Sequence, residues 1–117
     1  MTQAYGVRDP SYVRGYHAGI DFGCPVGTPV YCASDGIVRL SAEGYGDYGK
    51  LLVVEHIGDA ESWYAHLSRV DVRSGPVSAG QVIALSGATG RVTGPHLHFE
   101  YRVAGEPVDP APYLEGA

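Results

Sequence analysis

Turn-forming residues interrupt this sequence at short intervals from one end to the other. Its 17 glycines and 8 prolines are spread over all 117 residues and do not gather in one tract. Because both residues disfavour helix interiors and suit tight turns, they divide the chain into short segments. No segment carries apolar side chains at helical spacing for long enough to indicate a helix. The sequence therefore predicts an all-β fold with little or no helix.

Size and charge narrow the possibilities further. A chain of 117 residues with 44% hydrophobic residues suits one domain, predicted over residues 1–117 with its core at about 5–110. The formal charge of −5 and the lack of any basic run argue against a nucleic-acid partner. No apolar run approaches about 18 residues, and the N-terminus lacks the basic and apolar regions of an export signal, so neither a membrane span nor a signal peptide is expected.

The most informative strand is predicted over residues 94–101. Alternation along a strand places His96, His98 and Glu100 on one face. The other face carries only Leu97, Phe99 and Tyr101 and is expected to be core. If they line a cleft, two imidazoles on one face can bind a metal ion or act as general acid and base. The alternative is a pair of surface histidines on an exposed sheet.

A second strand is predicted over residues 17–22, with His17 and Asp21 on one face. In an extended strand these two residues are about 13 Å apart, too far to bind one ion together. If both are metal ligands, His17 must come from a bend, and Gly19 allows a turn or the close approach of another group. The alternative is a surface histidine and a turn-capping aspartate.

Two hairpins are predicted in the middle of the chain. One joins residues 51–57 to residues 62–68, and its alternation places Tyr64, His66 and Ser68 on one face, with Trp63, Ala65 and Leu67 on the other. The second joins residues 30–33 to residues 36–40 through an Asp-Gly turn. A lone strand histidine such as His56 or His66 is more often structural than catalytic. A buried strand is expected at 80–85.

Together these residues suggest a metal centre. Two imidazoles and one carboxylate, with a fourth position left for water, form a catalytic zinc set, whereas structural zinc sites use four protein ligands. The sequence contains no HExxH motif, so the general base is expected to be a histidine. The two cysteines, Cys24 and Cys32, have the wrong spacing for a zinc knuckle and are expected to be free thiols; the alternative is a disulfide between them, if their segments lie side by side.

Three ordered motifs resemble those of the M23 family of zinc metallopeptidases, the lysostaphin and LytM type that cut peptide cross-links of bacterial peptidoglycan. They are His17-Ala18-Gly19-Ile20-Asp21, Tyr64-Ala65-His66-Leu67-Ser68 and Gly94-Pro95-His96-Leu97-His98-Phe99-Glu100. The resemblance implies a small domain of antiparallel sheets with a cleft, the duplicated hybrid motif of that family.

The resemblance also assigns roles to residues. It implies one Zn²⁺ per chain held by His17, Asp21 and His98, with His66 and His96 as catalytic residues that face the attacking water and the developing oxyanion. Glu100 is expected to be a supporting or structural residue. The implied partner is peptidoglycan peptide, the implied place of action is the bacterial cell wall, and a monomer is expected.

Other readings remain open. Family members that have lost ligands act as non-catalytic binding or hydrolase-activating modules, and a wall-binding domain with tyrosine-rich loops is a second alternative. A tyrosine before the first ligand assists in some members, and Tyr12 and Tyr16 are the candidates here. The absence of an export signal fits the catalytic module of a phage endolysin, or an excised domain of a secreted enzyme. The bond that is cut is expected to depend on loops 41–50 and 86–95.

Overall fold

The computed structural model describes residues 19–90 and 94–108, and the statements below concern these residues. They form nine strands and one short 3₁₀ turn, so the predicted all-β class is confirmed. The elements are β1 (Ile20–Gly23), β2 (Pro29–Tyr31), β3 (Gly36–Ala42), η1 (Gly46–Tyr48), β4 (Lys50–His56), β5 (Ala60–Val70), β6 (Gly75–Val77), β7 (Val82–Ser86), β8 (His96–Val103) and β9 (Glu106–Val108).

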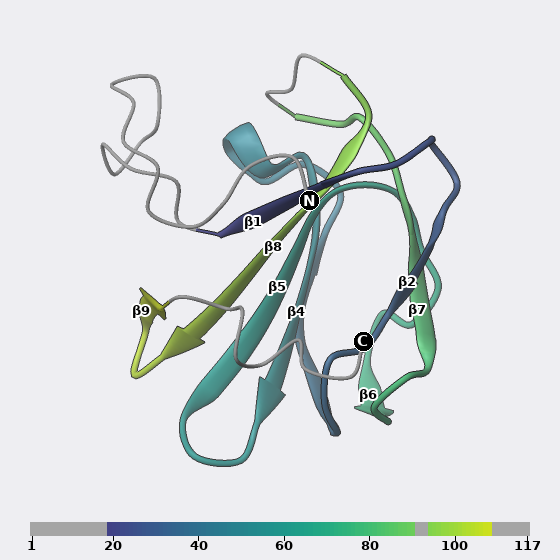
Figure 1. Cartoon of the computed structure of the whole chain (residues 1–117). Coiled ribbons are helices and arrows are strands. Elements are labelled where there is room, and N and C mark those ends of the chain that lie inside the picture. Colours follow the sequence, from purple (N-terminus) through teal and green to yellow (C-terminus); the bar gives the residue numbers. More distant parts are fainter. Residues whose placement is uncertain (1–18, 91–93, 109–117) are drawn as a thin grey trace.

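The strands form one antiparallel sheet in the order β1-β8-β5-β4-β3-β6, with β9 beside β8. In Figure 1, β1, β8, β5 and β4 run side by side; β7 pairs with the C-terminal part of β5 and has β2 on its other side. The predicted hairpin of β4 and β5 is present. Because β8 lies between β1 and β5, three segments that are distant in sequence become neighbours.

The two faces of this sheet bury different clusters of side chains. The larger cluster includes Phe99 and Tyr101 of β8, and β2 and β7 cover it with Val30 and Ile83. The smaller cluster, on the opposite face, contains Leu51, Val53, Trp63 and Ala65, with Tyr48 packed against it. His98 is in register with Ala65, and Glu100 with Trp63, so both lie on the face of the smaller cluster. The alternation predicted for residues 96–101 is therefore confirmed.

The alternation predicted for β5 is wrong at one point. Ala65 belongs to the smaller cluster, whereas Leu67 belongs to the larger one, although they were expected on the same face. The backbone of His66, between them, has φ of 61°. The pairing of β5 with β4 shifts register between Tyr64 and Leu67, and its pairing with β7 shifts between Leu67 and Arg69. A residue with a left-handed backbone conformation interrupts the alternation of side chains between the two faces, so His66 can lie on the same side as Ala65.

The hairpin predicted at the Asp-Gly sequence is also wrong. β2 pairs with β7, and β3 pairs with β4 and β6. Asp35 makes two contacts elsewhere: its side chain accepts a hydrogen bond from the amide of Ala79, and its carbonyl accepts one from His56. These tertiary contacts make Asp35-Gly36 a corner between β2 and β3, in place of a two-residue turn.

The remaining general predictions concern cysteines and membranes. Cys24 and Cys32 are both free, as expected, and Cys32 is buried. Within residues 19–90 and 94–108, the structure contains no helix long and apolar enough to span a membrane.

Candidate active site

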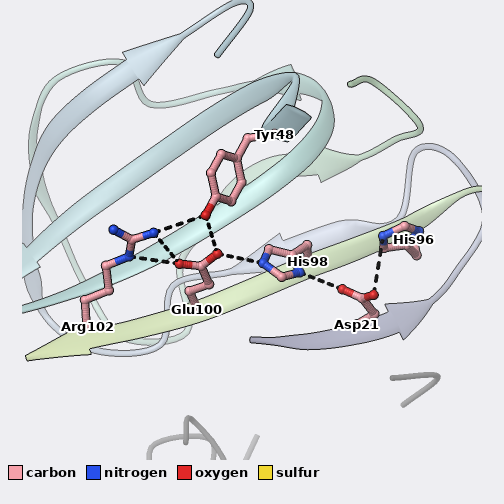
Figure 2. A network of polar contacts seen from close by, with 6 residues as sticks. All are labelled: Asp21, Tyr48, His96, His98, Glu100 and Arg102. Carbon is pink, nitrogen blue, oxygen red and sulfur yellow. Dashed lines mark hydrogen bonds and ion pairs between the residues drawn. The ribbon is translucent and has the colours of Figure 1, made fainter. Parts of the chain in front are cut away.

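Four of the five predicted site residues lie close together on the smaller-cluster side of the sheet. Asp21 of β1 is in register with His98 of β8, and their atoms Oδ1 and Nδ1 are 2.7 Å apart. His96 Nε2 lies 3.8 Å from Asp21 Oδ2 (Figure 2). The ring centroid of His66 is 4.8 Å from that of His96 and 5.9 Å from that of His98. Residues from three strands thus converge on one place.

The fifth predicted residue, His17, lies outside the described residues, as do Tyr12 and Tyr16. The described part of the chain alone contains no group of three side chains that could hold a metal ion. The predicted ligand set therefore needs a residue beyond Asp21 and His98.

The contact between β1 and β8 depends on a glycine. A Cβ atom on Gly19 would overlap the carbonyl oxygen of Phe99 and would lie 3.0 Å from His98 Cε1. Of the two roles suggested for Gly19, close approach is the one seen here. The absence of a side chain lets the segment that carries Asp21 lie directly against β8.

His66 is held by the loop that follows β7. Its Nδ1 is 2.7 Å from the carbonyl oxygen of Thr89. Because a carbonyl only accepts, Nδ1 carries the proton and the neutral ring has its lone pair on Nε2. Burial lowers the pKa of His66, the bond to Thr89 opposes this, and the electrostatic effect of the neighbouring His98 and His96 rings lowers it further, to about 4. His66 is therefore neutral at neutral pH.

His96 is oriented in the same manner. Its Nδ1 lies 3.0 Å from the carbonyl oxygen of Gly94, two residues earlier in the chain, and so donates to it. The Nε2 atom is left on the side of Asp21. His66 and His96 thus each use one ring nitrogen for orientation and keep the other as a proton acceptor.

Behind His98 lies a buried polar network that ends in an arginine (Figure 2). His98 Nε2 is 2.8 Å from Glu100 Oε2, and Glu100 is fully buried. The hydroxyl of Tyr48 donates to the same oxygen at 2.6 Å. Arg102 donates to Oε1 through Nε and Nη2, at 2.9 and 2.6 Å. Burial raises the pKa of Glu100, but the bond from His98 and the charges of His98 and Arg102 outweigh it and lower the pKa overall.

The two ring nitrogens of His98 both face carboxylates. Burial lowers the pKa of His98, but the hydrogen bonds to Asp21 and Glu100, together with their negative charges, raise it to about 9. An imidazole nitrogen and a carboxylate oxygen in direct contact hold either a proton or a metal ion. Nitrogen and oxygen donors of these types are ligands of zinc. Asp21 and His98 therefore fit a zinc site.

Two loops beside the site are interlocked at glycines. A Cβ on Gly49 would overlap the backbone of Thr89, and a Cβ on Gly90 would overlap the carbonyl of Asp47. Both glycines have positive φ, 67° and 81°. Thr89 adds two hydrogen bonds, from the amide of Lys50 and to the carbonyl of Leu67. The loop that carries Tyr48 and the loop that orients His66 therefore form one unit.

Sequence reasoning missed three of these supporting residues, Tyr48, Thr89 and Arg102. Tyr48 and Thr89 lie in glycine-rich loops whose path is not fixed by any local pattern. Arg102 had a signal that was not used, because an arginine at i+2 from Glu100 shares its strand face. The hydrogen bonds from Arg102 to Glu100 are of this kind.

Comparison with known proteins agrees with this geometry. Residues 15–110 match the family described as Peptidase family M23. The peptidoglycan DD-endopeptidase ShyA of Vibrio cholerae is 48% identical over 94 residues, which cover 80% of this chain and 22% of ShyA. Lysostaphin of Staphylococcus simulans is 41% identical over 109 residues, covering 88% of this chain and 22% of lysostaphin. The chain thus spans about a fifth of the length of these curated relatives.

Solved structures give the same result for the fold. The catalytic domain of lysostaphin from Staphylococcus simulans has a TM-score of 0.84 at 38% identity, covering 97% of this chain and 90% of that domain. A zinc-containing peptidase from Vibrio cholerae has a TM-score of 0.84 at 40% identity, covering 99% of this chain and 36% of that one. The M23 family match and the similar zinc-containing peptidase structure both suggest that the metal is zinc. The matches over most of its length establish that this chain belongs to peptidase family M23.

Proposed function

We propose that this chain is a zinc-dependent endopeptidase that hydrolyses peptide cross-links or stem peptides of bacterial peptidoglycan. Residues 1–117 act as a single, monomeric domain that works at the cell wall. One zinc ion per chain is held by His17, Asp21 and His98, and His66 and His96 are the catalytic residues. The names of its relatives support this proposal, since they include peptidoglycan DD-endopeptidases and glycyl-glycine endopeptidases.

One observation carries the proposal. Asp21 Oδ1 and His98 Nδ1 are 2.7 Å apart, and His66 and His96 stand beside them with one ring nitrogen each bound to a backbone carbonyl. Four residues from three strands bring together a carboxylate and an imidazole nitrogen that could bind a metal ion, and two histidines that could accept a proton. A surface polar cluster would not need two histidines oriented in this manner.

The chain's own residues would act on the peptide as follows. When bound, zinc supplies Lewis-acid polarisation of a carbonyl and a lowered pKa for water, towards about 7. In hydrolysis, water adds to the scissile carbonyl carbon, loses a proton, and the C–N bond breaks once the amine nitrogen is protonated. A neutral histidine accepts the proton at Nε2, and the resulting imidazolium stabilises the oxyanion or returns the proton to the amine. His66 and His96 are the two residues positioned for these steps.

Loss of metal separates this enzyme from a non-catalytic wall-binding module. We expect a chelator to abolish the release of peptides from purified cell walls, and added Zn²⁺ to restore it. A binding module would release nothing under either condition. Binding of the chain to walls, measured in parallel by sedimentation, distinguishes loss of catalysis from loss of binding.

The bond that is cut is tested with walls of defined cross-link. Walls with glycine bridges and walls with direct cross-links are digested separately, and the fragments are identified by mass spectrometry. New termini within the bridge would indicate a glycyl-glycine endopeptidase, and new termini at direct cross-links a DD-endopeptidase. Cleavage of neither type of wall by zinc-loaded protein would contradict the proposed function.

A further inference from the structure

We propose that Glu100 is a positioning residue for the metal ligand His98, and that Arg102 and Tyr48 fix the orientation in which it acts. The inference rests on the proposed function in one respect, since it takes His98 as a zinc ligand. It concerns a carboxylate that is fully buried beside the proposed ligand.

The first step concerns what Glu100 can do to His98. Glu100 is fully buried, and its Oε2 lies 2.8 Å from His98 Nε2. Tyr48 and Arg102 donate three further hydrogen bonds to the two carboxylate oxygens. A carboxylate surrounded by donors is ionised and can only accept. The Nε2 atom of His98 must therefore carry a proton.

The second step concerns the other side of the ring. If a metal ion takes the place of the proton between Nδ1 and Asp21, the one remaining ring proton is on Nε2 and the lone pair is on Nδ1. Nδ1 is the atom that faces Asp21 Oδ1 at 2.7 Å. Glu100 therefore selects the form of His98 whose lone pair points toward the other proposed ligand. Carboxylates that bind the free N–H of a ligating histidine have this effect in zinc proteins in general.

The third step shows why Arg102 and Tyr48 belong to the same device. The guanidinium of Arg102 lies 3.6 Å from the centre of the Trp63 ring, and its side chain is 11% exposed. Its Nη2 also donates to the hydroxyl of Tyr48 at 3.1 Å. Arg102 is thus packed between Trp63 and Glu100 and cannot turn away without leaving both. It holds one oxygen of Glu100, so the other must face His98.

The Glu100→Gln variant tests this arrangement. Because Arg102 only donates, the oxygen of the new side-chain amide turns toward Arg102, and the amide nitrogen faces His98. The amide N–H donates to Nε2, so the ring proton moves to Nδ1, where the metal should bind. We expect zinc to bind about 10- to 100-fold more weakly, measured by competition with a chromophoric chelator.

A spectroscopic measurement identifies the cause. In the wild type we expect a low-field resonance of the His98 Nε2 proton, protected from exchange by the bond to buried Glu100. This resonance should be lost in Glu100→Gln. An unchanged Nε2 proton together with zinc affinity within about twofold of the wild type would overturn the proposal.

Two further variants keep the test valid if Glu100→Gln does not fold. Tyr48→Phe removes a single hydroxyl and should weaken zinc binding by about threefold, the effect of one lost hydrogen bond. Ser62→Ala is the matched control, because Ser62 is also fully buried and bonded to a histidine, His56, on the opposite face. It should lower stability and leave zinc affinity unchanged. Equal weakening in Tyr48→Phe and Ser62→Ala would mean a general loss of stability and would also overturn the proposal.

The failure of the inference can be told from the failure of the proposed function. If the wild-type chain binds no zinc, the proposed function fails, and the Nε2 resonance still tests the contact with Glu100. If the wild type binds zinc and cleaves walls while Glu100→Gln and Tyr48→Phe bind zinc equally well, only the positioning role fails.

Discussion

Two buried histidines, one on each face of the sheet, show how similar sequence positions acquire different roles. His56 bonds to Ser62 Oγ and to the carbonyl oxygen of Asp35, each at 2.8 Å. One ring nitrogen of His98 faces buried Glu100, and the other faces Asp21 at the site. Both histidines are 8% exposed. Burial therefore does not separate them; the charge of their partners does.

The partners explain the difference. Around His56 the groups are neutral: a hydroxyl, a carbonyl, and the hydroxyl of Tyr64, to which Ser62 donates at 2.8 Å. Neutral partners satisfy the two ring nitrogens and bring no negative charge that would bind a cation. Around His98 there are two carboxylates, so the ring is held in negative surroundings that favour a proton or a metal ion. We call His56 and its neutral partners the core network, and His98 and its two carboxylates the site network.

The largest expected effect is the difference between substituting His98 and substituting His56. We expect His98→Ala to abolish zinc binding and wall cleavage, because it removes a proposed ligand. His56→Gln should keep both per folded molecule and lose only stability. Zinc content after equilibrium dialysis and peptide release from walls are the measurements. Zinc binding by His98→Ala at wild-type affinity would contradict the comparison.

A large effect on turnover without loss of metal is expected at His96. His96→Ala should retain zinc and lower kcat by about 10²- to 10⁴-fold, the usual contribution of a general acid or base. Zinc affinity and single-turnover cleavage separate the two properties. Near-normal turnover would refute the role assigned to His96.

The contact of β1 with β8 can be weakened without touching a site side chain. In Gly19→Ala the new methyl group overlaps the backbone of Phe99, and the free energy of unfolding should fall by about 3 kcal/mol, as in overpacked cores. Zinc affinity should also fall, because Asp21 is displaced from His98. Denaturant unfolding and chelator competition test this. The matched change Gly44→Ala, where nothing lies within 4 Å of the new Cβ, should have little effect on either.

A smaller loss of stability is expected in the core network. Ser62→Ala leaves His56 Nε2 without a buried partner and should lower the free energy of unfolding by about 2 kcal/mol. The cleavage rate per folded molecule should not change. A lower rate at full zinc occupancy would show that the two networks are coupled across the sheet.

The smallest effect is a dependence on alkaline pH. Burial, and then the neighbouring Cys32, raise the pKa of Tyr64 above its ordinary value of 10.0. Since the unfolded chain then releases its proton first, the stabilisation is present below pH 10 and is lost as the pH rises further. Wild-type stability should therefore fall faster than that of Tyr64→Phe, by up to about 1.4 kcal/mol per pH unit. Parallel slopes in urea unfolding between pH 10 and 11 would contradict this.

Alternation allowed much of the site to be predicted from the sequence. The face shared by His96, His98 and Glu100 follows from the period of two along β8, and the partner face is core as expected. Alternation failed at His66, because φ of 61° is a property imposed by the fold that the residue type does not reveal. The Asp-Gly sequence at residues 35–36 misled for a related reason: its local turn preference is outweighed by hydrogen bonds to Ala79 and His56.

The interlocked glycines 49 and 90 have a consequence for protein engineering. The two loops touch backbone to backbone at these glycines, and the side chain of Thr89 joins them further by accepting a hydrogen bond from the amide of Lys50. A graft that replaces one loop alone, in order to redirect cleavage toward a different cross-link, would meet a partner of the wrong shape. The two loops should therefore be transplanted together, as a single cassette.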